Sequence, residues 1–288
     1  MSEDLMKMLA RLSVMFAALF VAFAAGKAED KSVEFGVTVY KMGESKATDK
    51  DAGDSFDKLL AYLGNKIEGP RFVRRGIRNK SDEALKLMQD DKARTALAFV
   101  SPNFYFKNKD SLKLTVLAEA QRKGINGEQY VLIGKTKAEK YPEGKKVATN
   151  LDDAEWLNKV VMPAPDGAKP LEWVKSKNIF DNLLDIAYDD SEVDFVLVDR
   201  ITLALVEENK DLKGLARGLK SEMLPQDLVV EVDGRLGDKR DAIKKVLKEL
   251  DASEEGKKVG EAIQVPKFMD TDEARVKAAS EKFNKVAK

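Results

Sequence analysis

The segment Thr95-Ala-Leu-Ala-Phe-Val100-Ser-Pro-Asn-Phe-Tyr105-Phe106 begins with six residues that carry almost no polar side-chain atoms. Such a run is typical of a strand that is buried on both faces, as in a parallel sheet. Pro102 cannot donate a hydrogen bond to a neighbouring strand, so we expect the strand to end beside it in a Ser101-Pro102 turn. Ligands of open α/β sheets usually bind beyond the carboxyl ends of the strands. The segment therefore predicts an α/β protein that binds a ligand near this turn.

Strands alternate with helices on the N-terminal side of this segment. Residues 33–40 alternate and are rich in β-branched side chains, which predicts a strand. Apolar residues then recur every three or four positions up to Gly64, a helical pattern. A weaker strand over residues 71–77 and a helix beginning near Ser81 follow. This spacing predicts βαβ units and a parallel sheet.

The pattern changes after Tyr105. Residues 112–118 and 129–133 predict two strands with no helix between them, which indicates a crossing between domains. A second apolar run, residues 193–198, is followed by Asp199-Arg200 and a helix. This repeats the order of the first segment, namely buried strand, polar residues and helix. The sequence therefore predicts two similar α/β lobes.

Composition limits the chemistry that the chain can perform. The 288 residues are 43% hydrophobic and 35% charged, and 50 Lys and Arg balance 50 Asp and Glu, so no global charge favours a nucleic acid partner. The chain contains no histidine and no cysteine, which excludes Ser-His-Asp and Cys-His catalysis, disulfides and the usual zinc sites. We see no nucleophile paired with a base, and we expect binding without catalysis and without a cofactor.

The N-terminal residues have the pattern of a secretory signal peptide. Lys7 and Arg11 precede the apolar residues 12–25, and small residues suitable for cleavage follow. The apolar run is shorter than the roughly 20 residues that a membrane-spanning helix needs. We therefore expect residues 1–28 to be a signal peptide cleaved near residues 24–28, and the mature protein to be periplasmic.

Several short motifs resemble one family, in the same order along the chain. Residues 101–105, Ser-Pro-Asn-Phe-Tyr, are similar to the Gly-Pro-x-x-Tyr motif of type 2 periplasmic substrate-binding proteins of ABC transporters, in the phosphate/phosphonate-binding branch. Residues 192–198 resemble the branch's Val-Asp-Ala strand, and Ser221 with Pro225 resembles its Ser-x-x-x-Pro motif. Residues 265–272 resemble its closing Phe-x-x-x-x-Asp motif.

The resemblance implies a two-lobed clamshell of the α/β class, in which each lobe is a mainly parallel sheet flanked by helices. Lobe 1 would comprise residues 29–122 and 222–288, and lobe 2 residues 123–221. A small-molecule ligand would bind between the lobes and be delivered to the membrane permease of an ABC transporter by a monomeric protein. The alternative is a periplasmic sensor or scaffold of the same fold that docks on a membrane partner without transport. A third possibility is an exported hydrolase or transferase that uses carboxylates.

One segment departs from the branch. Where the branch has Ser-Thr-Ser-Gly at the start of a helix that holds an anion, this chain has Thr149-Asn150-Leu-Asp152-Asp153. Carboxylates in the first turn of a helix occupy its positive end and repel a dianion at close range. We therefore expect a ligand other than phosphate or phosphonate.

The candidate ligand contacts follow the ends of the predicted strands. The alternative for the aromatic residues is core packing, which we expect for Phe104 and Phe106 and also for Trp156. The alternative for the polar residues is turn formation, a surface position or helix capping, the last above all for Asp199. The predicted contacts are Tyr40, Ser101, Asn103, Tyr105, Gln121 and Arg122 in lobe 1, and Thr149, Asn150, Asp199 and Arg200 in lobe 2.

Overall fold

The computed structural model describes residues 33–40, 49–122 and 125–285. The predicted signal peptide, residues 1–28, lies outside the described residues. A compact unit, Glu34–Lys288, contains all the elements described below. Within the described ranges, no helix combines the length and the apolar character needed to cross a membrane.

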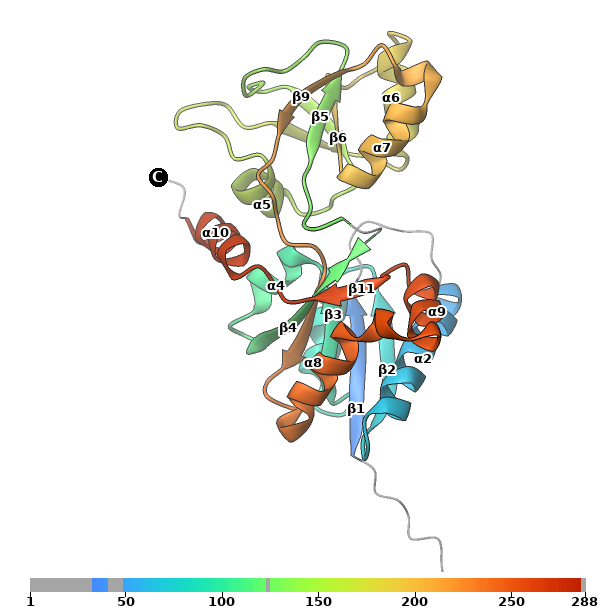
Figure 1. Cartoon of the computed structure of the whole chain (residues 1–288). Helices are drawn as coiled ribbons and strands as arrows, with labels where there is room; N and C mark the ends of the chain where they lie inside the picture. The colour runs from blue at the N-terminus through green and yellow to red at the C-terminus, as the bar shows by residue number, and fades with distance from the viewer. Residues whose placement is uncertain (1–32, 41–48, 123–124, 286–288) are drawn as a thin grey trace, which may run out of the picture. The chain divides into compact units, whose positions relative to one another are not determined.

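The first sheet has six strands in the order β11-β4-β10-β3-β1-β2 (Figure 1). Strands β2, β1 and β3 are parallel, whereas β10 is antiparallel to both β3 and β4, and β11 is antiparallel to β4. The strands are β1 (Glu34–Tyr40), β2 (Arg71–Arg78), β3 (Thr95–Val100), β4 (Leu114–Gln121), β10 (Leu228–Val232) and β11 (Lys267–Met269).

Helices cover both faces of this sheet. All six residues of β3 are buried, which confirms the prediction of a strand buried on both faces. Leu97 belongs to an apolar cluster with α2 (Asp49–Lys66), α8 (Arg240–Lys248) and α9 (Glu254–Ala262). Ala98 points to the opposite face, where α3 (Ser81–Gln89) and α4 (Pro102–Asn108) pack. The alternation of side chains along a strand accounts for this division.

The second sheet has five strands in the order β7-β6-β8-β5-β9. Strands β7, β6 and β8 are parallel, and β5 is antiparallel to both β8 and β9. Helices α6 (Ile179–Ala187) and α7 (Arg200–Glu208) contribute to the apolar cluster on one face, and α5 (Ala154–Trp156) with a π-helical turn (Leu157–Val161) contributes to the cluster on the other. The strands are β5 (Val131–Gly134), β6 (Lys146–Thr149), β7 (Glu172–Lys175), β8 (Phe195–Val198) and β9 (Ala216–Lys220).

The last helix, α10 (Glu273–Asn284), shares an aromatic cluster with α4 and α5. Phe106 of α4 stacks on Trp156 of α5 with ring centroids 5.6 Å apart, and Phe283 of α10 lies 6.3 Å from each of these rings. Phe104 and Phe106 are 0% and 4% exposed and Trp156 is 2% exposed, so the prediction of core positions is confirmed.

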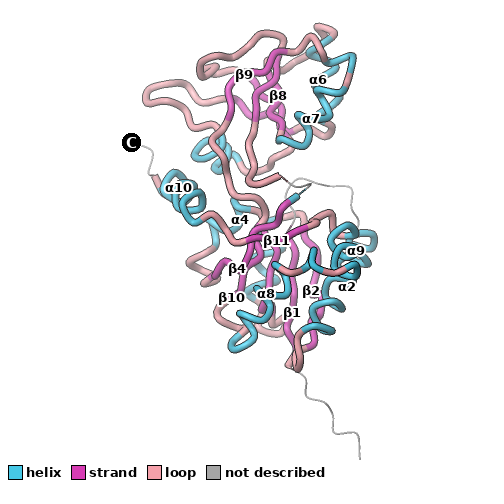
Figure 2. Tube along the Cα trace, viewed as in Figure 1, coloured by secondary structure: helices cyan, strands magenta, loops and turns pink. Residues whose placement is uncertain are grey.

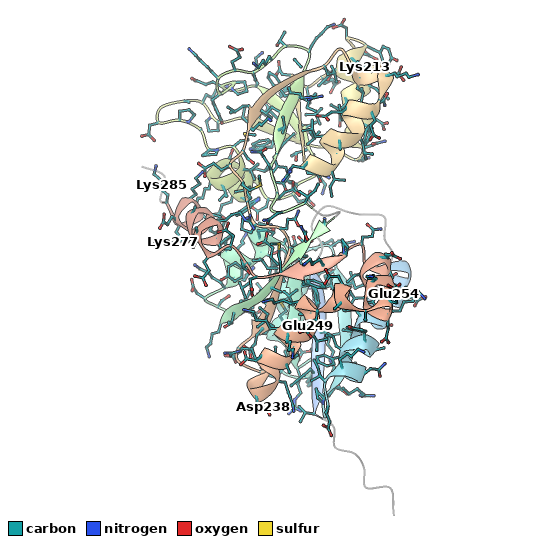
Figure 3. All side chains as sticks on the ribbon, viewed as in Figure 1. Lys213, Asp238, Glu249, Glu254, Lys277 and Lys285 are labelled. Atoms are coloured by element: carbon teal, nitrogen blue, oxygen red, sulfur yellow. The ribbon has the colours of Figure 1, made fainter. Side chains whose placement is uncertain are left out.

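The segment after β3 differs in one respect from the prediction. Pro102 does end the strand, but it also begins helix α4 where a turn was expected. Proline is favoured at the first helical position because no backbone N–H is needed there. Short helices and turns of this kind connect the longer elements throughout the chain (Figure 2). Charged side chains such as Lys213, Asp238 and Glu254 are exposed at the surface (Figure 3).

Candidate functional site

A cavity of about 80 Å³ lies where the ends of strands from both sheets meet, and we call it the cleft cavity. Ser101 follows β3, Asn150 follows β6 and Asp199 follows β8, and all three line the cavity. The segments that cross between the sheets supply the other polar side chains of the lining, namely Arg122, Glu128, Tyr130, Gln226 and Asp227. Convergence of polar groups on one cavity at the carboxyl ends of strands is the usual arrangement of a ligand site in α/β proteins.

Two other cavities are larger but differ in their lining. One, of about 280 Å³, is lined mainly by apolar residues of the first sheet and its helices, including Val39, Phe56 and Phe268. The other, of about 770 Å³, lies between β4 and α10, where lysines and carboxylates alternate with apolar residues. Neither contains a residue that directly precedes or follows a strand of the second sheet, whereas Tyr130, Asn150 and Asp199 of the cleft cavity do. The cleft cavity is therefore the candidate site, although its volume is the smallest of the three.

Two carboxylates of the cleft cavity lie close together. Asp199 caps helix α7, because its Oδ1 accepts a hydrogen bond from the backbone N–H of Thr202 at 2.6 Å. Oε1 of Glu128 accepts hydrogen bonds from the backbone N–H groups of Gln129 at 2.9 Å and Arg200 at 3.3 Å. Burial and the nearby Asp199 raise the pKa of Glu128 to about 7. Glu128 is therefore a carboxyl group that changes its charge near neutral pH.

The opposite wall of the cavity contains one ion pair. The guanidinium of Arg122 pairs with the carboxylate of Asp227, and the backbone N–H of Arg122 donates to Oε1 of Gln226 at 3.0 Å. Tyr130 also lines the cavity, and burial, followed by the charges of Glu128, Asp199 and Asp227, raises its pKa well above the usual value. Arg122 pairs with Asp227 and also lowers the pKa of Glu128, so its positive charge acts on both carboxylates.

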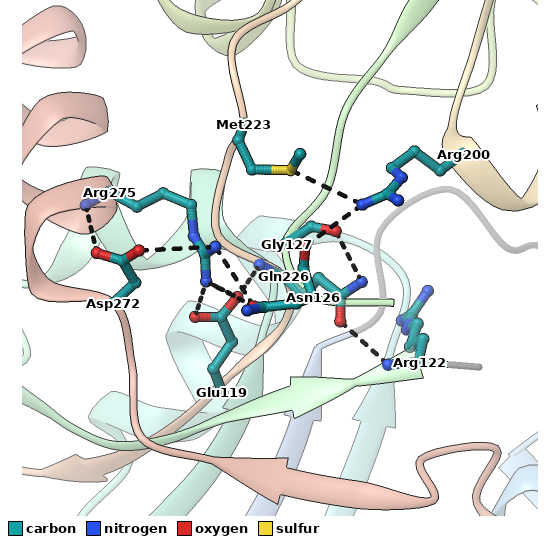
Figure 4. A network of polar contacts seen from close by, with 9 residues as sticks. All are labelled: Glu119, Arg122, Asn126, Gly127, Arg200, Met223, Gln226, Asp272 and Arg275. Atoms are coloured by element: carbon teal, nitrogen blue, oxygen red, sulfur yellow. Dashed lines mark hydrogen bonds and ion pairs between the residues drawn. The ribbon is translucent and has the colours of Figure 1, made fainter. Parts of the chain in front are cut away.

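A polar network joins the crossing segments to β4 and α10 (Figure 4). Arg275 of α10 donates from Nη2 to both carboxylate oxygens of Glu119 at 2.9 and 2.8 Å, and these side chains are 8% and 1% exposed. The same guanidinium contacts Oδ1 of Asn126, and Oε1 of Glu119 accepts from the backbone N–H of Gln226 at 2.9 Å. The network fixes the positions from which Glu128 and Asp227 reach the cavity.

The junction after β3 is held by neutral side chains. Ser101 donates from Oγ to Oδ1 of Asn103, and Nδ2 of Asn103 donates to Oδ2 of Asp153 at 3.0 Å. Asn103 is 2% exposed and therefore links the two lobes' residues instead of facing the cavity. Burial raises the pKa of Tyr40 to about 12, a hydrogen bond with Asn103 opposes this, and Asp153 and Asp152 add to it.

The structure brings four of the ten predicted contact residues to the cleft cavity, namely Ser101, Arg122, Asn150 and Asp199. Tyr40 lines the 280 Å³ cavity and Tyr105 the 770 Å³ cavity. The buried Thr149 accepts a hydrogen bond at Oγ1 from the backbone N–H of Leu151. Gln121 ends β4 beside Lys267, and the guanidinium of Arg200 donates to the carbonyl oxygen of Asn126 at 3.3 Å. Asp199 also caps helix α7, which is the alternative role that the sequence predicted for it.

Glu128, Tyr130, Gln226 and Asp227 were missed in the sequence. They precede β5 and β10, which run antiparallel to their neighbours, so the beginnings of these strands lie at the same edge as the ends of the parallel strands. A search limited to residues that follow the carboxyl ends of strands therefore misses these four residues. The signal was present in the run of polar residues before each apolar strand, at 126–129 and 226–227.

Within the described residues, no group of three or more acidic side chains is arranged to hold a metal ion. The cleft cavity therefore contains hydrogen-bond donors, carboxylates and aromatic rings, but no candidate metal site among these residues.

Comparison with solved structures identifies the fold. XAC2383 from Xanthomonas citri bound to ATP matches with a TM-score of 0.64 and 10% identity, over 88% of this chain and 97% of that chain. The chain has the type 2 periplasmic-binding-protein fold. A binding protein component of an ABC phosphonate transporter from Pseudomonas aeruginosa (PA3383) matches at 0.58 with 15% identity, over 88% of this chain and 86% of that one. PhnD1 from Prochlorococcus marinus in complex with methylphosphonate matches at 0.58 with 11% identity, over 89% and 100%.

These matches confirm the predicted two-lobed α/β fold and its resemblance to the phosphonate-binding branch. No protein-family model matches the sequence, and no curated protein matches it. At sequence identities of 10–15% these comparisons establish the fold only. The function is therefore argued from the residues of the site.

Proposed function

We propose that the protein is an exported solute-binding protein that captures a small ligand between two lobes for uptake by an ABC transporter. The observation that carries the proposal is the cleft cavity, because its polar lining comes from residues that follow strands of both sheets and from the segments that connect the sheets. Lobe 1 would comprise residues 29–122 and 222–288 and lobe 2 residues 123–221. A ligand that contacts Ser101 and Asp199 together would hold the lobes closed.

The crossing segments have the construction of a hinge. The segment between β4 and β5 and the segment between β9 and β10 run antiparallel, joined by hydrogen bonds between Glu128 and Leu224 at 2.7 Å. Ser221 adds bonds to the backbone of Tyr130. Two short paired segments can absorb the backbone rotations of domain closure while the sheets remain rigid.

The neighbours that are described as binding proteins support a role in binding without catalysis. In this proposal residues 1–28 direct export, the mature monomer resides in the periplasm, and the loaded protein docks on a membrane permease. No cofactor takes part, and ligand recognition is the protein's contribution to uptake.

One observation favours the alternative of a sensor or scaffold. The Asn103–Asp153 hydrogen bond and the stack of Phe106 on Trp156 join elements attached to the two different sheets. These contacts would limit the change of shape on ligand binding. A protein that reports a bound ligand to a membrane partner needs less movement than one that releases its ligand to a permease.

The proposal is tested by native mass spectrometry of the mature protein after incubation with a desalted small-molecule extract of the source cells. We expect the wild type to retain a small molecule. Asn150→Trp fills the cleft cavity and should abolish retention. The matched control, Leu205→Trp, places the same side chain at an exposed position of α7 in the second lobe and should retain the molecule. No retained molecule, or equal retention by both variants, would contradict a ligand site in this cavity.

Crosslinking in whole cells separates the two roles. Transport predicts that the protein crosslinks to the permease of an ABC transporter, and that its deletion stops uptake of the retained molecule. The alternative predicts crosslinks to a membrane-bound kinase or regulator and unchanged uptake.

A further inference from the structure

We propose that the cleft cavity selects an organic cation, with Glu128 and Asp199 as the residues that recognise its positive charge. The inference rests on the proposed function, since it names the class of solute that the same cavity would take. It departs from the solved neighbours with ATP or methylphosphonate, whose ligands are anions.

The charges around the cavity favour a cation. Glu128, Asp199 and Asp227 supply carboxylates, and Arg122 is the cation of the lining, paired with Asp227. Arg200 is adjacent, but its guanidinium donates to the carbonyl oxygen of Asn126 and contacts the sulfur of Met223 at 4.0 Å. Among the described residues, the lining of the cavity therefore has three carboxylates against one arginine, which pairs with Asp227 and also lowers the pKa of Glu128.

Both carboxylates retain capacity to bind a ligand. The helix cap uses Oδ1 of Asp199, and the two backbone N–H groups use Oε1 of Glu128. A carboxylate has two oxygens and about four lone-pair sites, so each can accept a further hydrogen bond from an ammonium or guanidinium group. Charge-assisted bonds of this kind are the strongest that a small cavity can offer.

The remaining walls suit an organic cation better than a metal ion. Tyr130 and Trp156 line the cavity beside the carboxylates, and aromatic rings attract ammonium and guanidinium groups. Within the described residues there is no arrangement of acidic side chains that could hold a metal ion. A cavity of about 80 Å³ is small against the roughly 300–1,000 Å³ of sites for drug-sized ligands, so it fits a compact charged group.

A carboxylate also precedes helix α5, shortly after Asn150 and Leu151 of the cavity lining. Asp153, in the segment that departs from the phosphonate-binding branch, caps helix α5 through Oδ1 and accepts from Asn103 through Oδ2. Asp152 pairs with Lys175 at 2.7 Å. The positive end of the helix, where an anion would otherwise bind, is thus already occupied by a carboxylate of the chain.

Isothermal titration of the mature protein tests the inference with methylammonium, guanidinium and choline as compact cationic probes and methylphosphonate as the anionic probe. We expect at least one cation to bind with Kd below about 1 mM and methylphosphonate to bind at least tenfold more weakly. Asp199→Asn keeps a capping side chain, and Glu128→Gln keeps the shape of the side chain. Each should weaken cation binding about 10- to 100-fold, because a hydrogen bond to a charged group is lost.

Glu207→Gln, which removes an exposed carboxylate elsewhere on α7, is the matched control and should bind with unchanged affinity. Near neutral pH, cation binding to the wild type should also release protons to the solvent. The release is measured by repeating the titration in buffers with different ionisation enthalpies and comparing the binding heats. A bound cation favours the ionised form of Glu128, and Glu128→Gln should show no such release.

The inference is overturned if none of the three cations binds, if methylphosphonate binds more tightly than they do, or if both variants bind as the wild type does. Its failure is distinguishable from failure of the proposed function. A solute that is retained from cell extract and is neutral or anionic would leave solute binding intact and exclude cation selectivity. Loss of all retention in the extract experiment would exclude both.

Discussion

Glu119 lies in β4 and Glu128 in the crossing segment that follows it, and their surroundings differ. Glu119 is 1% exposed, and both of its oxygens accept from the guanidinium of Arg275. Glu128 accepts hydrogen bonds from two backbone N–H groups, and burial together with the like charge of Asp199 raises its pKa against the opposing effects of these bonds and of Arg122. A buried carboxylate paired with arginine is costly to separate from its partner, whereas one that shares a cavity with another carboxylate is available to a ligand.

We expect the largest loss of stability from breaking the ion pair between Glu119 and Arg275. Arg275→Met leaves Glu119 buried without its cation and should lower the free energy of unfolding by about 3–5 kcal/mol, measured by urea denaturation. Lys282→Met, on the same helix, removes a more exposed pair with Glu222 and should cost about 0–1 kcal/mol. Equal effects of the two substitutions would mean that the Glu119 pair is not a structural element of the hinge.

The same substitution should have opposite effects at the two carboxylates. Glu119→Gln leaves Arg275 with a weaker acceptor and should destabilise the protein by roughly 1–3 kcal/mol. Glu128→Gln removes a charge that is costly to bury and should leave stability unchanged or increase it above about pH 7. Urea denaturation of both variants at the same pH measures the difference. Destabilisation by Glu128→Gln as large as that by Glu119→Gln would remove the distinction between them.

The pH dependence of stability isolates Glu128. Its pKa is raised from 4.5 to about 7 in the folded state, so between these values the folded protein binds more protons than the unfolded protein. Stability is therefore full below the unfolded pKa and falls as the pH rises through about 7, by roughly 1–3 kcal/mol. The chain has no histidine, which keeps this range free of histidine titration.

Thermal unfolding of the wild type and Glu128→Gln between about pH 5 and 8 measures this decline. The variant should show a flatter profile. A wild-type profile that rises over the same range would contradict the raised pKa of Glu128. Carboxylates with lowered pKa values, such as Asp194 and Asp270, lose their contribution at lower pH, as the pH falls through those values.

The two junctions after the buried strands should respond unequally to alanine. Asp199→Ala removes a side-chain cap from α7 and should cost about 0.5–2 kcal/mol. Ser101 precedes α4 without a capping hydrogen bond from its side chain, so Ser101→Ala should cost less. Circular dichroism during thermal unfolding compares them. A larger loss at Ser101 would show that its bond to Asn103 is the more important of the two.

The sequence predicted the scaffold better than the site. The apolar runs of β3 and β8, the end of β3 at Pro102 and the core positions of Phe104 and Phe106 follow from local patterns, which burial in a sheet imposes directly. Asp199 was found for the same reason, since it follows an apolar strand. Glu128 and Asp227 were not found, because their position depends on strands that run antiparallel and pair over long distances in the sequence.

Tyr105 and Asn103 illustrate a second limit. Both follow β3, but α4 begins at once and turns successive side chains in different directions. Tyr105 is directed to the cavity beside α10 and Asn103 to Asp153. Proximity to a strand end therefore selects a region of the molecule, and the helix geometry decides which side chain reaches the ligand cavity.

The most direct test of the central claim is amide hydrogen exchange of the protein with and without the molecule retained from cell extract. A ligand in the cleft cavity should slow exchange together at residues 128–131, 150–151 and 199–203, which come from the segment between β4 and β5 and from the segments that follow β6 and β8. Slowing confined to residues 52–56 and 262–265, which line the 280 Å³ cavity of the first sheet, would contradict the account.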